Sequence, residues 1–239
     1  MIKLVHASIS EHGTSGWDGN AQAGDQTGRE VCVRSWYSKP WSLCLRYSNE
    51  TVAAAAAAAA VKLASSGLVG YDQSQRNTLY RALRKYGYDV DAYIRSGVKT
   101  ETDCSALVYA CYCIYIPSMR SDANAPTTGE MREYYGKRGF SALTGAEYTS
   151  SPDRLRNGDI LVKPNGHTAM ATDGSTSAAT SPPKEAAPTA ASTVYSPEIA
   201  SALDAMARDV IAGRWGTGTD RRDRIYAAVQ ARVNEILHG

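Results

Sequence analysis

Residues 103–117 read DCSALVYACYCIYIP, and this stretch decides the fold. From Cys104 the chain is rich in alanine, valine, cysteine and tyrosine up to residue 115. Pro117 then interrupts it, because proline lacks the amide hydrogen that a helix requires. We therefore predict an apolar, buried helix over residues 105–115 that starts at Cys104. A cysteine in such a helix is either a small core residue or a nucleophile, and composition alone does not decide between them.

A second residue bears on that choice. A nucleophilic cysteine must be partly thiolate near neutral pH, and a helix N-terminus beside an imidazole lowers the thiol pKa. His167 follows Gly166 at the start of a predicted strand and could supply the imidazole. A strand edge beside a helix terminus can hold a Cys–His pair within hydrogen-bond reach. Cys104 and His167 are therefore the candidate catalytic pair.

The rest of the first 173 residues alternates between strand and helix signals. Residues 159–163 and 167–172 form a predicted hairpin around the turn Pro164-Asn165-Gly166. Asn49 is a predicted N-cap for an alanine-rich helix that ends near Gly67. The other predicted elements are strands over 3–9, 31–37 and 42–47 and a helix over 73–85 with Leu79 and Leu83 on its buried face. These signals favour an α+β fold.

The composition leaves most functions open but argues against a disulfide framework and a zinc site. The chain has 239 residues, a formal net charge of +2 and 43% hydrophobic residues, so it is long enough for a catalytic domain plus a small appendage. The charge demands neither nucleic acid nor a membrane surface. Five cysteines without a Cys-x-x-Cys pair indicate neither a disulfide framework nor a zinc site. We expect no metal and no cofactor.

The N-terminal ten residues carry one lysine and no long apolar run, so we expect no secretory signal peptide. The longest apolar run, residues 52–61, is too short for a membrane span, which takes roughly 20 residues. We expect synthesis in the cytoplasm and no membrane anchor.

Residues 174–194 are mainly serine, threonine, alanine and proline, a composition that does not offset the entropy of ordering. We interpret them as a linker between a domain over 1–173 and a small module over 195–239. Pro197 near the start of a predicted helix and the glycines at 213–218 indicate two helical segments in that module.

Three motifs in order resemble those of the NlpC/P60 peptidoglycan hydrolases. They are Asp103-Cys104-Ser105-Ala106-Leu107-Val108, Gly158-Asp159-Ile160-Leu161 and Gly166-His167-Thr168-Ala169. The resemblance implies a papain-like fold, with the cysteine heading a helix packed on an antiparallel sheet and the histidine on an adjacent strand. The family's Tyr-x-Trp-Gly-Gly pattern before the cysteine is absent here. Substrate-pocket details therefore do not carry over.

The mechanism implied is thiolate attack on a peptide carbonyl, with His167 as acid and base. The amide of Cys104 at the helix start is the expected oxyanion donor, since unpaired amides there point outward. Ser105, through its own amide, and Asp103 are expected to support the site.

A third polar residue normally orients the histidine from the next strand in this family, but the chain enters the linker after Asp173-Gly174. Residues 3–8 resemble the missing strand, and Trp36-Tyr37 and Pro40-Trp41 resemble the segment that follows it. We therefore expect a circular permutation, which surface hairpins tolerate. His6 would then orient His167. The alternatives are a solvent-exposed His6 and an orienting role for Asp173.

The C-terminal module resembles the CW_7 repeat, through residues 207–218, 221–224 and 229–234. The resemblance implies a three-helix bundle that binds the muropeptide part of peptidoglycan. Arg214, Trp215, Arg221 and Arg222 are the candidate wall-binding residues. The alternatives are a core role for Trp215 and a solvated face for the arginines.

Together these features predict a phage or prophage endolysin that cuts an amide bond in the stem peptide, with endopeptidase activity preferred. The alternatives are an N-acetylmuramoyl-L-alanine amidase and a catalytically dead cell-wall-binding protein. The expected partner is bacterial peptidoglycan, without nucleic acid or membrane. We expect a monomer that reaches the wall through a holin.

Overall fold

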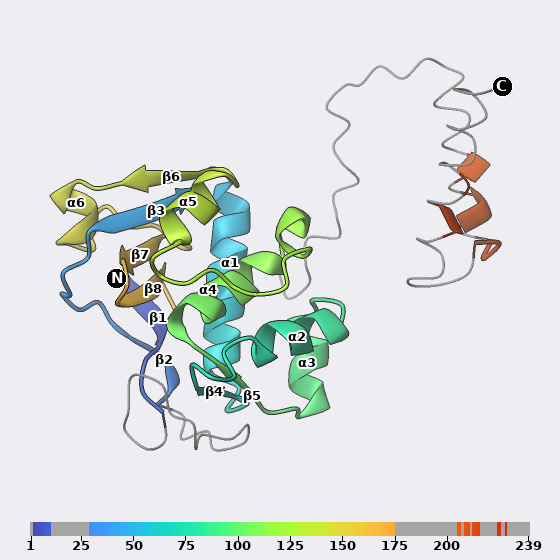
Figure 1. Ribbon diagram of the computed structural model, residues 1–239, viewed down its shortest axis with the longest axis horizontal. Helices are drawn as coiled ribbons and strands as arrows, with labels where there is room; N and C mark the ends of the chain where they lie inside the picture. The colour runs from blue at the N-terminus through green and yellow to red at the C-terminus, as the bar shows by residue number, and fades with distance from the viewer. Residues whose placement is uncertain are drawn as a thin grey trace, which may run out of the picture. The chain divides into compact units, whose positions relative to one another are not determined.

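The computed structural model describes residues 2–10, 29–174 and parts of the tail: 205–206, 208–210, 212–215, 224–225 and 228. The chain divides into two compact units, residues 1–185 and 186–239. The first unit contains all the strands and most of the helix among these described residues (Figure 1). It is mixed α+β, as predicted.

A six-stranded sheet in the order β2-β1-β8-β7-β3-β6 forms one side of this unit. All its pairings are antiparallel. The strands are β1 (Lys3–Ala7), β2 (Val31–Ser35), β3 (Leu43–Tyr47), β6 (Phe140–Leu143), β7 (Ile160–Lys163) and β8 (His167–Thr172). Strands predicted over 3–9, 31–37, 42–47 and both hairpin arms are therefore present, the first two shorter than expected.

The first strand lies beside the last. Val5 of β1 pairs with Met170 of β8, and Lys3 pairs with Thr172. The segment at the start of the chain thus occupies the sheet position next to the His167 strand, which is the position that the permutation predicted for it. The sheet also brings β2 to its edge beyond β1.

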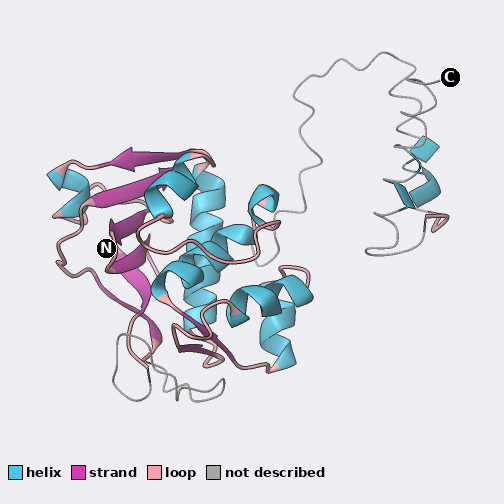
Figure 2. Ribbon diagram, in the orientation of Figure 1, coloured by secondary structure: helices cyan, strands magenta, loops and turns pink. Residues whose placement is uncertain are grey.

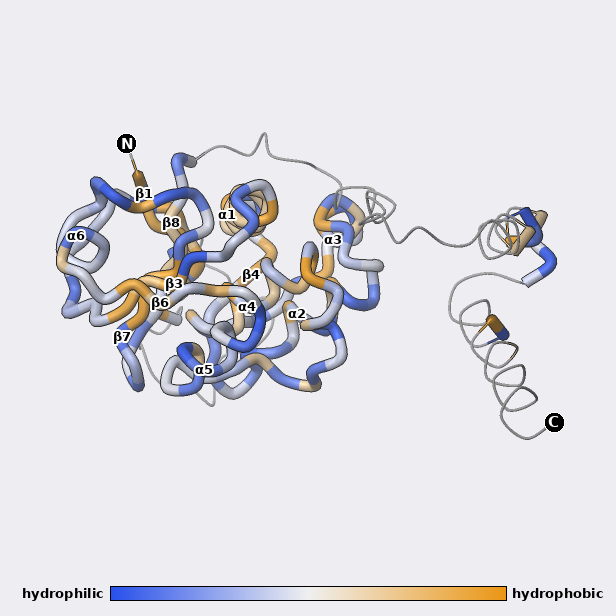
Figure 3. Tube along the Cα trace, turned by 90° about the horizontal axis from the view of Figure 1, so that it is seen from above, coloured by the Kyte–Doolittle hydropathy of each residue, from blue (hydrophilic) through white to orange (hydrophobic). Residues whose placement is uncertain are grey.

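Two buried helices cover one face of the sheet. Figure 2 shows the sheet strands in magenta and the helices in cyan beside them. α1 (Glu50–Ala64) is capped by Asn49, whose side chain accepts a hydrogen bond from the Val52 amide. Its alanines let it approach both β8 and α4 (Cys104–Cys113) closely. All ten residues of α4 are buried, including Cys111 and Cys113. Figure 3 shows hydrophobic residues along α1 and the strands that it covers.

A small parallel pair, β4 (Val69–Tyr71) with β5 (Thr100–Thr102), lies beside these helices. A parallel pair needs a long crossover, which α2 (Thr78–Lys85) and α3 (Val90–Ser96) provide. The predicted helix over 73–85 begins five residues late, because the Asp72 carboxylate accepts hydrogen bonds from the amide and hydroxyl of Ser74 and holds a turn there. Leu79 and Leu83 are fully buried, as predicted.

Short elements complete the first unit. They are the 3₁₀ turn η1 (Pro117–Met119) and the helices α5 (Met131–Gly136) and α6 (Ala146–Thr149). In the second unit, helical residues at 208–210 end in a turn at residues 212–215. Within the described ranges, no helix combines the length and apolar character needed to cross a membrane.

Candidate functional site

The site is built where the start of α4 meets the start of β8. Asp103 is the N-cap of α4, and its carboxylate accepts a hydrogen bond from the Ala106 amide at 2.7 Å. Cys104 is therefore the first residue of the helix, and only 7% of it is exposed. The backbones of Thr168 and Ser105 are near enough to the thiol to lower its pKa. Since Thr168 directly follows His167, the sulfur lies against the histidine-bearing strand.

Burial dominates the thiol's acidity. Burial, followed by the Asp103 carboxylate, raises the pKa of Cys104 to about 12, although the backbones of Thr168 and Ser105 and the Arg76 charge lower it. The sequence predicted a lowered pKa from the helix N-terminus, and that prediction is wrong for this arrangement. Desolvation of a buried thiolate outweighs the favourable field of the helix terminus and two amides.

One tyrosine hydroxyl joins the two histidines. Tyr37 Oη lies 3.1 Å from His167 Nε2 and 3.0 Å from His6 Nδ1. Side chains alternate along a strand, and the pairing of Val5 with Met170 puts His6 and His167 on the same face of neighbouring strands. Their ring centroids are 5.7 Å apart. His6 therefore reaches His167 through Tyr37.

Trp41 covers the other side of the His167 ring. Its indole stacks on the imidazole with centroids 5.9 Å apart and an interplanar angle of 26°. The indole nitrogen donates to the carbonyl of Tyr37, which ties the two aromatic residues together. The imidazole is thus held by a hydrogen bond at Nε2 and by an aromatic face. Its Nδ1 is the nitrogen that remains to exchange a proton.

Both histidines are neutral at pH 7. Burial lowers the pKa of His167 to about 3, with smaller contributions from Lys39 and His6. Burial, Arg34 and Lys39 lower the pKa of His6 to about 4. A neutral imidazole beside a neutral thiol can act only if the proton moves from sulfur to nitrogen during the attack.

A cavity of about 270 Å³ opens beside the two imidazoles. Its lining consists of His6, Ser8, Ile9, Arg34, Tyr37, Lys39, Tyr71, Gly166 and His167. Cys104 is not in this lining, but its charge raises the pKa of two lining residues, Tyr37 and Tyr71. Larger cavities of about 540 and 710 Å³ elsewhere on this unit have neither cysteine nor histidine in their linings. Of these three cavities, the small one is the one that His167 lines.

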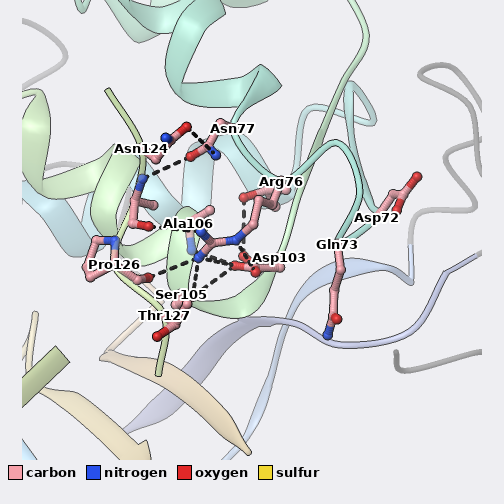
Figure 4. A network of polar contacts seen from close by, with 12 residues as sticks. Asp72, Gln73, Arg76, Asn77, Asp103, Ser105, Ala106, Asn124, Pro126 and Thr127 are labelled. Atoms are coloured by element: carbon pink, nitrogen blue, oxygen red, sulfur yellow. Dashed lines mark hydrogen bonds and ion pairs between the residues drawn. The ribbon is translucent and has the colours of Figure 1, made fainter. Parts of the chain in front are cut away.

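Arg76 holds the start of α4 in place (Figure 4). Its Nε donates to the Asp103 carboxylate at 2.5 Å, and one terminal nitrogen donates to the Ser105 hydroxyl at 2.7 Å. The guanidinium also donates to the carbonyls of Ala125 and Pro126. Asp103 and Ser105 therefore support the site through this network, in which the Ser105 hydroxyl in turn donates to Asp103 at 3.0 Å.

Two family models match the chain. Residues 4–178 match the endolysin-like domain, and residues 204–237 match the CW_7 repeat. The chain belongs to the endolysin-like family. Neither the curated proteins nor the solved structures contain a match. The endolysin-like domain together with a CW_7 repeat supports a cell-wall-lytic endolysin whose partner is peptidoglycan.

The endolysin-like domain brings Cys104, Ser105, Asp103, His167 and His6 to one place, but not Asp173. Asp173 follows the far end of β8, six residues from His167, which is about 20 Å along a strand. Its carboxylate accepts a hydrogen bond from the Asn157 side chain at 2.8 Å. Asp173 is therefore in no position to orient His167.

In the CW_7 match, Arg214 donates to Asp209 at 2.8 Å and is exposed, while Trp215 is half-buried. Arg221 and Arg222 lie outside the described residues, as does all but the first residue of the linker predicted over 174–194. The role of the four wall-binding candidates stays a prediction.

Tyr37, Trp41 and Arg76 were not identified as site residues from the sequence. Tyr37 and Trp41 lie in a stretch without helix or strand between β2 and β3, where no periodicity marks them. Their only signal was the resemblance of Trp36-Tyr37 and Pro40-Trp41 to a family segment. Arg76 had none, because its partners are 27 to 50 residues away in the chain.

Proposed function

We propose that this endolysin-like protein hydrolyses an amide bond of the peptidoglycan stem peptide, with Cys104 as nucleophile and His167 as general base. One observation carries the proposal. Cys104 is the first residue of α4, which packs on β8 with its thiol near the Thr168 backbone, and the residue before Thr168 is His167, whose Nε2 is bound to Tyr37. A nucleophile, a base and a group that orients the base are the parts that acyl transfer requires.

The tautomer of His167 follows from its role. Nδ1 must be unprotonated to accept the thiol proton, so Nε2 carries the hydrogen and donates to the Tyr37 oxygen. Tyr37 in turn donates its hydroxyl hydrogen to His6 Nδ1. When His167 becomes an imidazolium, this chain of hydrogen bonds stabilises the added charge in a site shielded from water.

Catalysis then proceeds in two halves. The Cys104 proton passes to His167 as the sulfur attacks the carbonyl carbon, and the carbonyl oxygen becomes an oxyanion. The amide of Cys104, which has no acceptor within its own helix, is positioned to donate to that oxyanion. Collapse breaks the C–N bond, the amine leaves with the proton from His167, and a thioester remains. Water, deprotonated by His167, releases the acid and restores the thiol.

We further propose a permuted, papain-like NlpC/P60 enzyme with endopeptidase activity. The support is the position of β1 beside β8 and of α4 on the antiparallel sheet. The proposal also includes a linker over 174–194 and a three-helix CW_7 module over 195–239. In that module, Arg214, Trp215, Arg221 and Arg222 are proposed to contact the cell wall. The protein is proposed to act as a monomer that leaves the host cytoplasm through a holin.

Turbidity of purified cell walls tests the nucleophile. Cys104→Ala is expected to abolish the fall in turbidity, while Cys111→Ala, the same change two turns along α4, is expected to preserve it. Loss of activity in both variants, or in neither, would remove Cys104 from the mechanism. A wild-type protein that binds walls without clearing them would be a wall-binding protein only.

Mass spectrometry of the released fragments tests the bond. A cut within the stem peptide identifies an endopeptidase. A new N-terminal alanine on a glycan-free peptide identifies the amidase instead.

A further inference from the structure

The cavity beside the two histidines is cationic. Arg34 and Lys39 both line it, and Lys163 lies alongside the Gly166 backbone at its rim. Among the described residues, no aspartate or glutamate is part of the lining, and neither Arg34 nor Lys39 forms an ion pair with a carboxylate. Within the part of the chain that the structure describes, two positive charges therefore face a small cavity without a neutralising group.

This positive field reaches the proposed catalytic groups. Lys39 contributes to the lowered pKa of both histidines, and Arg34 contributes to that of His6, in each case after burial. Such a field makes it harder for His167 to accept a proton. An anion bound between the two cations would reverse the effect, since a nearby negative charge favours the imidazolium.

The cations are also close to where the bond would break. The Arg34 guanidinium stacks on the Tyr37 ring, 4.9 Å from its centroid, and the hydroxyl of that ring is 3.1 Å from His167. Only the Tyr37 ring therefore separates a group bound at Arg34 from His167. Ile9, which is 47% exposed, and Tyr71 give the same cavity an apolar wall suited to a small aliphatic side chain.

We propose that this cavity binds a free carboxylate of the stem peptide, carried on a residue next to the cleaved amide, through Arg34 and Lys39. The inference rests on the proposed function for its substrate. Its consequence is selectivity: a peptide with the free acid is cleaved, and the same peptide with that carboxyl converted to a primary amide is a poor substrate. The amide has the same shape but lacks the charge that the two cations recognise.

Three synthetic stem peptides test the selectivity. The parent has a free α-carboxyl on its γ-linked D-glutamate and a free C-terminal carboxyl, and each of the others has one of these amidated. Amidation of the recognised carboxyl is expected to lower kcat/KM about tenfold or more, because a charge-assisted hydrogen bond is lost. The amidated peptide whose kcat/KM falls identifies which carboxyl is bound. Equal kcat/KM values for all three would overturn the proposal.

Variants of the full chain assign the effect to the cavity. Arg34→Gln and Lys39→Gln are each expected to reduce the acid-to-amide ratio about tenfold, whereas Arg34→Lys preserves most of it. Arg132→Gln removes an exposed positive charge from α5 and should leave the ratio unchanged. An unchanged ratio in both cavity variants would overturn the assignment.

Binding measurements test the carboxylate subsite independently of the proposed hydrolysis. Calorimetry with the Cys104→Ala protein measures the affinity for each peptide without hydrolysis. If wild-type protein cleaves none of the peptides but Cys104→Ala binds the acid about tenfold more tightly than its amide, the carboxylate subsite stands and the proposed reaction fails. If Cys104→Ala binds acid and amide equally, the subsite fails, whatever the enzyme cleaves.

Discussion

Tyr37 places one hydroxyl between two imidazoles, and this arrangement makes His6 act at a distance. A hydroxyl has one hydrogen to donate, so the direction of the chain is fixed once His167 is required to present a free Nδ1. His6 then matters because it accepts the Tyr37 hydrogen and leaves the Tyr37 oxygen to accept from His167. Both residues are positioning residues in this scheme.

If His6 acts on His167 only through Tyr37, substitutions of His6 and Tyr37 should have non-additive effects on the rate. Tyr37→Phe is expected to lower kcat at least about tenfold with little change in KM, because the imidazolium loses its hydrogen-bond partner. His6→Ala is expected to lower the rate of wall lysis strongly without unfolding the protein. The double variant should be no slower than Tyr37→Phe alone. Losses that multiply would show that His6 acts independently of Tyr37, and an unchanged rate in His6→Ala would remove it from the site.

The lowered pKa values of the histidines also predict how stability depends on pH. In the unfolded chain a histidine binds a proton below about 6.5, whereas His6 and His167 in the folded protein do so only near 4 and 3. The unfolded state therefore binds more protons between these values. Stability is complete above pH 6.5 and is lost as the pH falls toward 4 and then 3, by up to about 3 kcal/mol for His6 and about 5 kcal/mol for His167.

Urea unfolding at pH 7 and pH 4.5 measures this loss. His6→Gln, which keeps a hydrogen-bonding side chain but cannot titrate, is expected to lose less stability than wild type over the same interval. Equal losses in the two proteins would contradict the buried, neutral state of His6.

At the scale of elements, the start of α4 depends on one carboxylate with two functions. Asp103 caps the helix at Ala106 and forms the ion pair with Arg76, whose side chain is only 17% exposed. The same arginine binds the carbonyls of Ala125 and Pro126, so one guanidinium joins three segments. The position of the Cys104 sulfur depends on this junction.

Asp103→Ala is expected to lower the free energy of unfolding by about 3 kcal/mol, because the cap is lost and Arg76 is left without a carboxylate. Chemical denaturation measures the change. Glu133→Ala, which removes an exposed ion pair with Lys137, is the control and should leave the midpoint unchanged. A similar midpoint for both variants would show that the Arg76 network does not hold the helix.

The Gly158-Asp159 motif fixes the start of the β7–β8 hairpin. Gly158 has φ +88°, and a Cβ at this position would lie 2.4 Å from the carbonyl oxygen of Ala53 on α1. Asp159 then receives two hydrogen bonds from Arg46 and one from the Arg156 amide. The Gly-Asp pair thus packs the hairpin that carries His167 against α1 and ties it to β3.

At the scale of the whole molecule, catalysis and wall attachment are assigned to separate parts of the chain. The endolysin-like match ends at residue 178, and the CW_7 match begins at residue 204. All residues of the proposed catalytic site lie within the first unit, residues 1–185. A tethered binding module raises the local concentration of substrate without altering the chemistry.

Removal of residues 186–239 is therefore expected to reduce co-sedimentation with purified walls and to slow their lysis. The kcat/KM for a soluble stem peptide should stay the same. Arg214→Ala in the full chain is the milder counterpart, since it removes one proposed wall contact. A fall in soluble-peptide hydrolysis after truncation would place part of the catalytic site in the second unit.

The sequence alone determined the local elements. Periodicity, capping residues and glycine positions predicted α1, α4 and the β7–β8 hairpin, and the motif around Cys104 and His167 indicated the chemistry. These signals are local, because helix caps and strand alternation depend on neighbours within a few residues.

Tertiary structure alone decided the rest. The Tyr37 bridge and the Arg76 network join residues 27 to 130 positions apart, and the cationic cavity is lined by residues from both ends of the first unit; no local pattern encodes such distances. Burial also reversed the expected acidity of Cys104, because desolvation depends on everything packed around the sulfur rather than on its place in a helix.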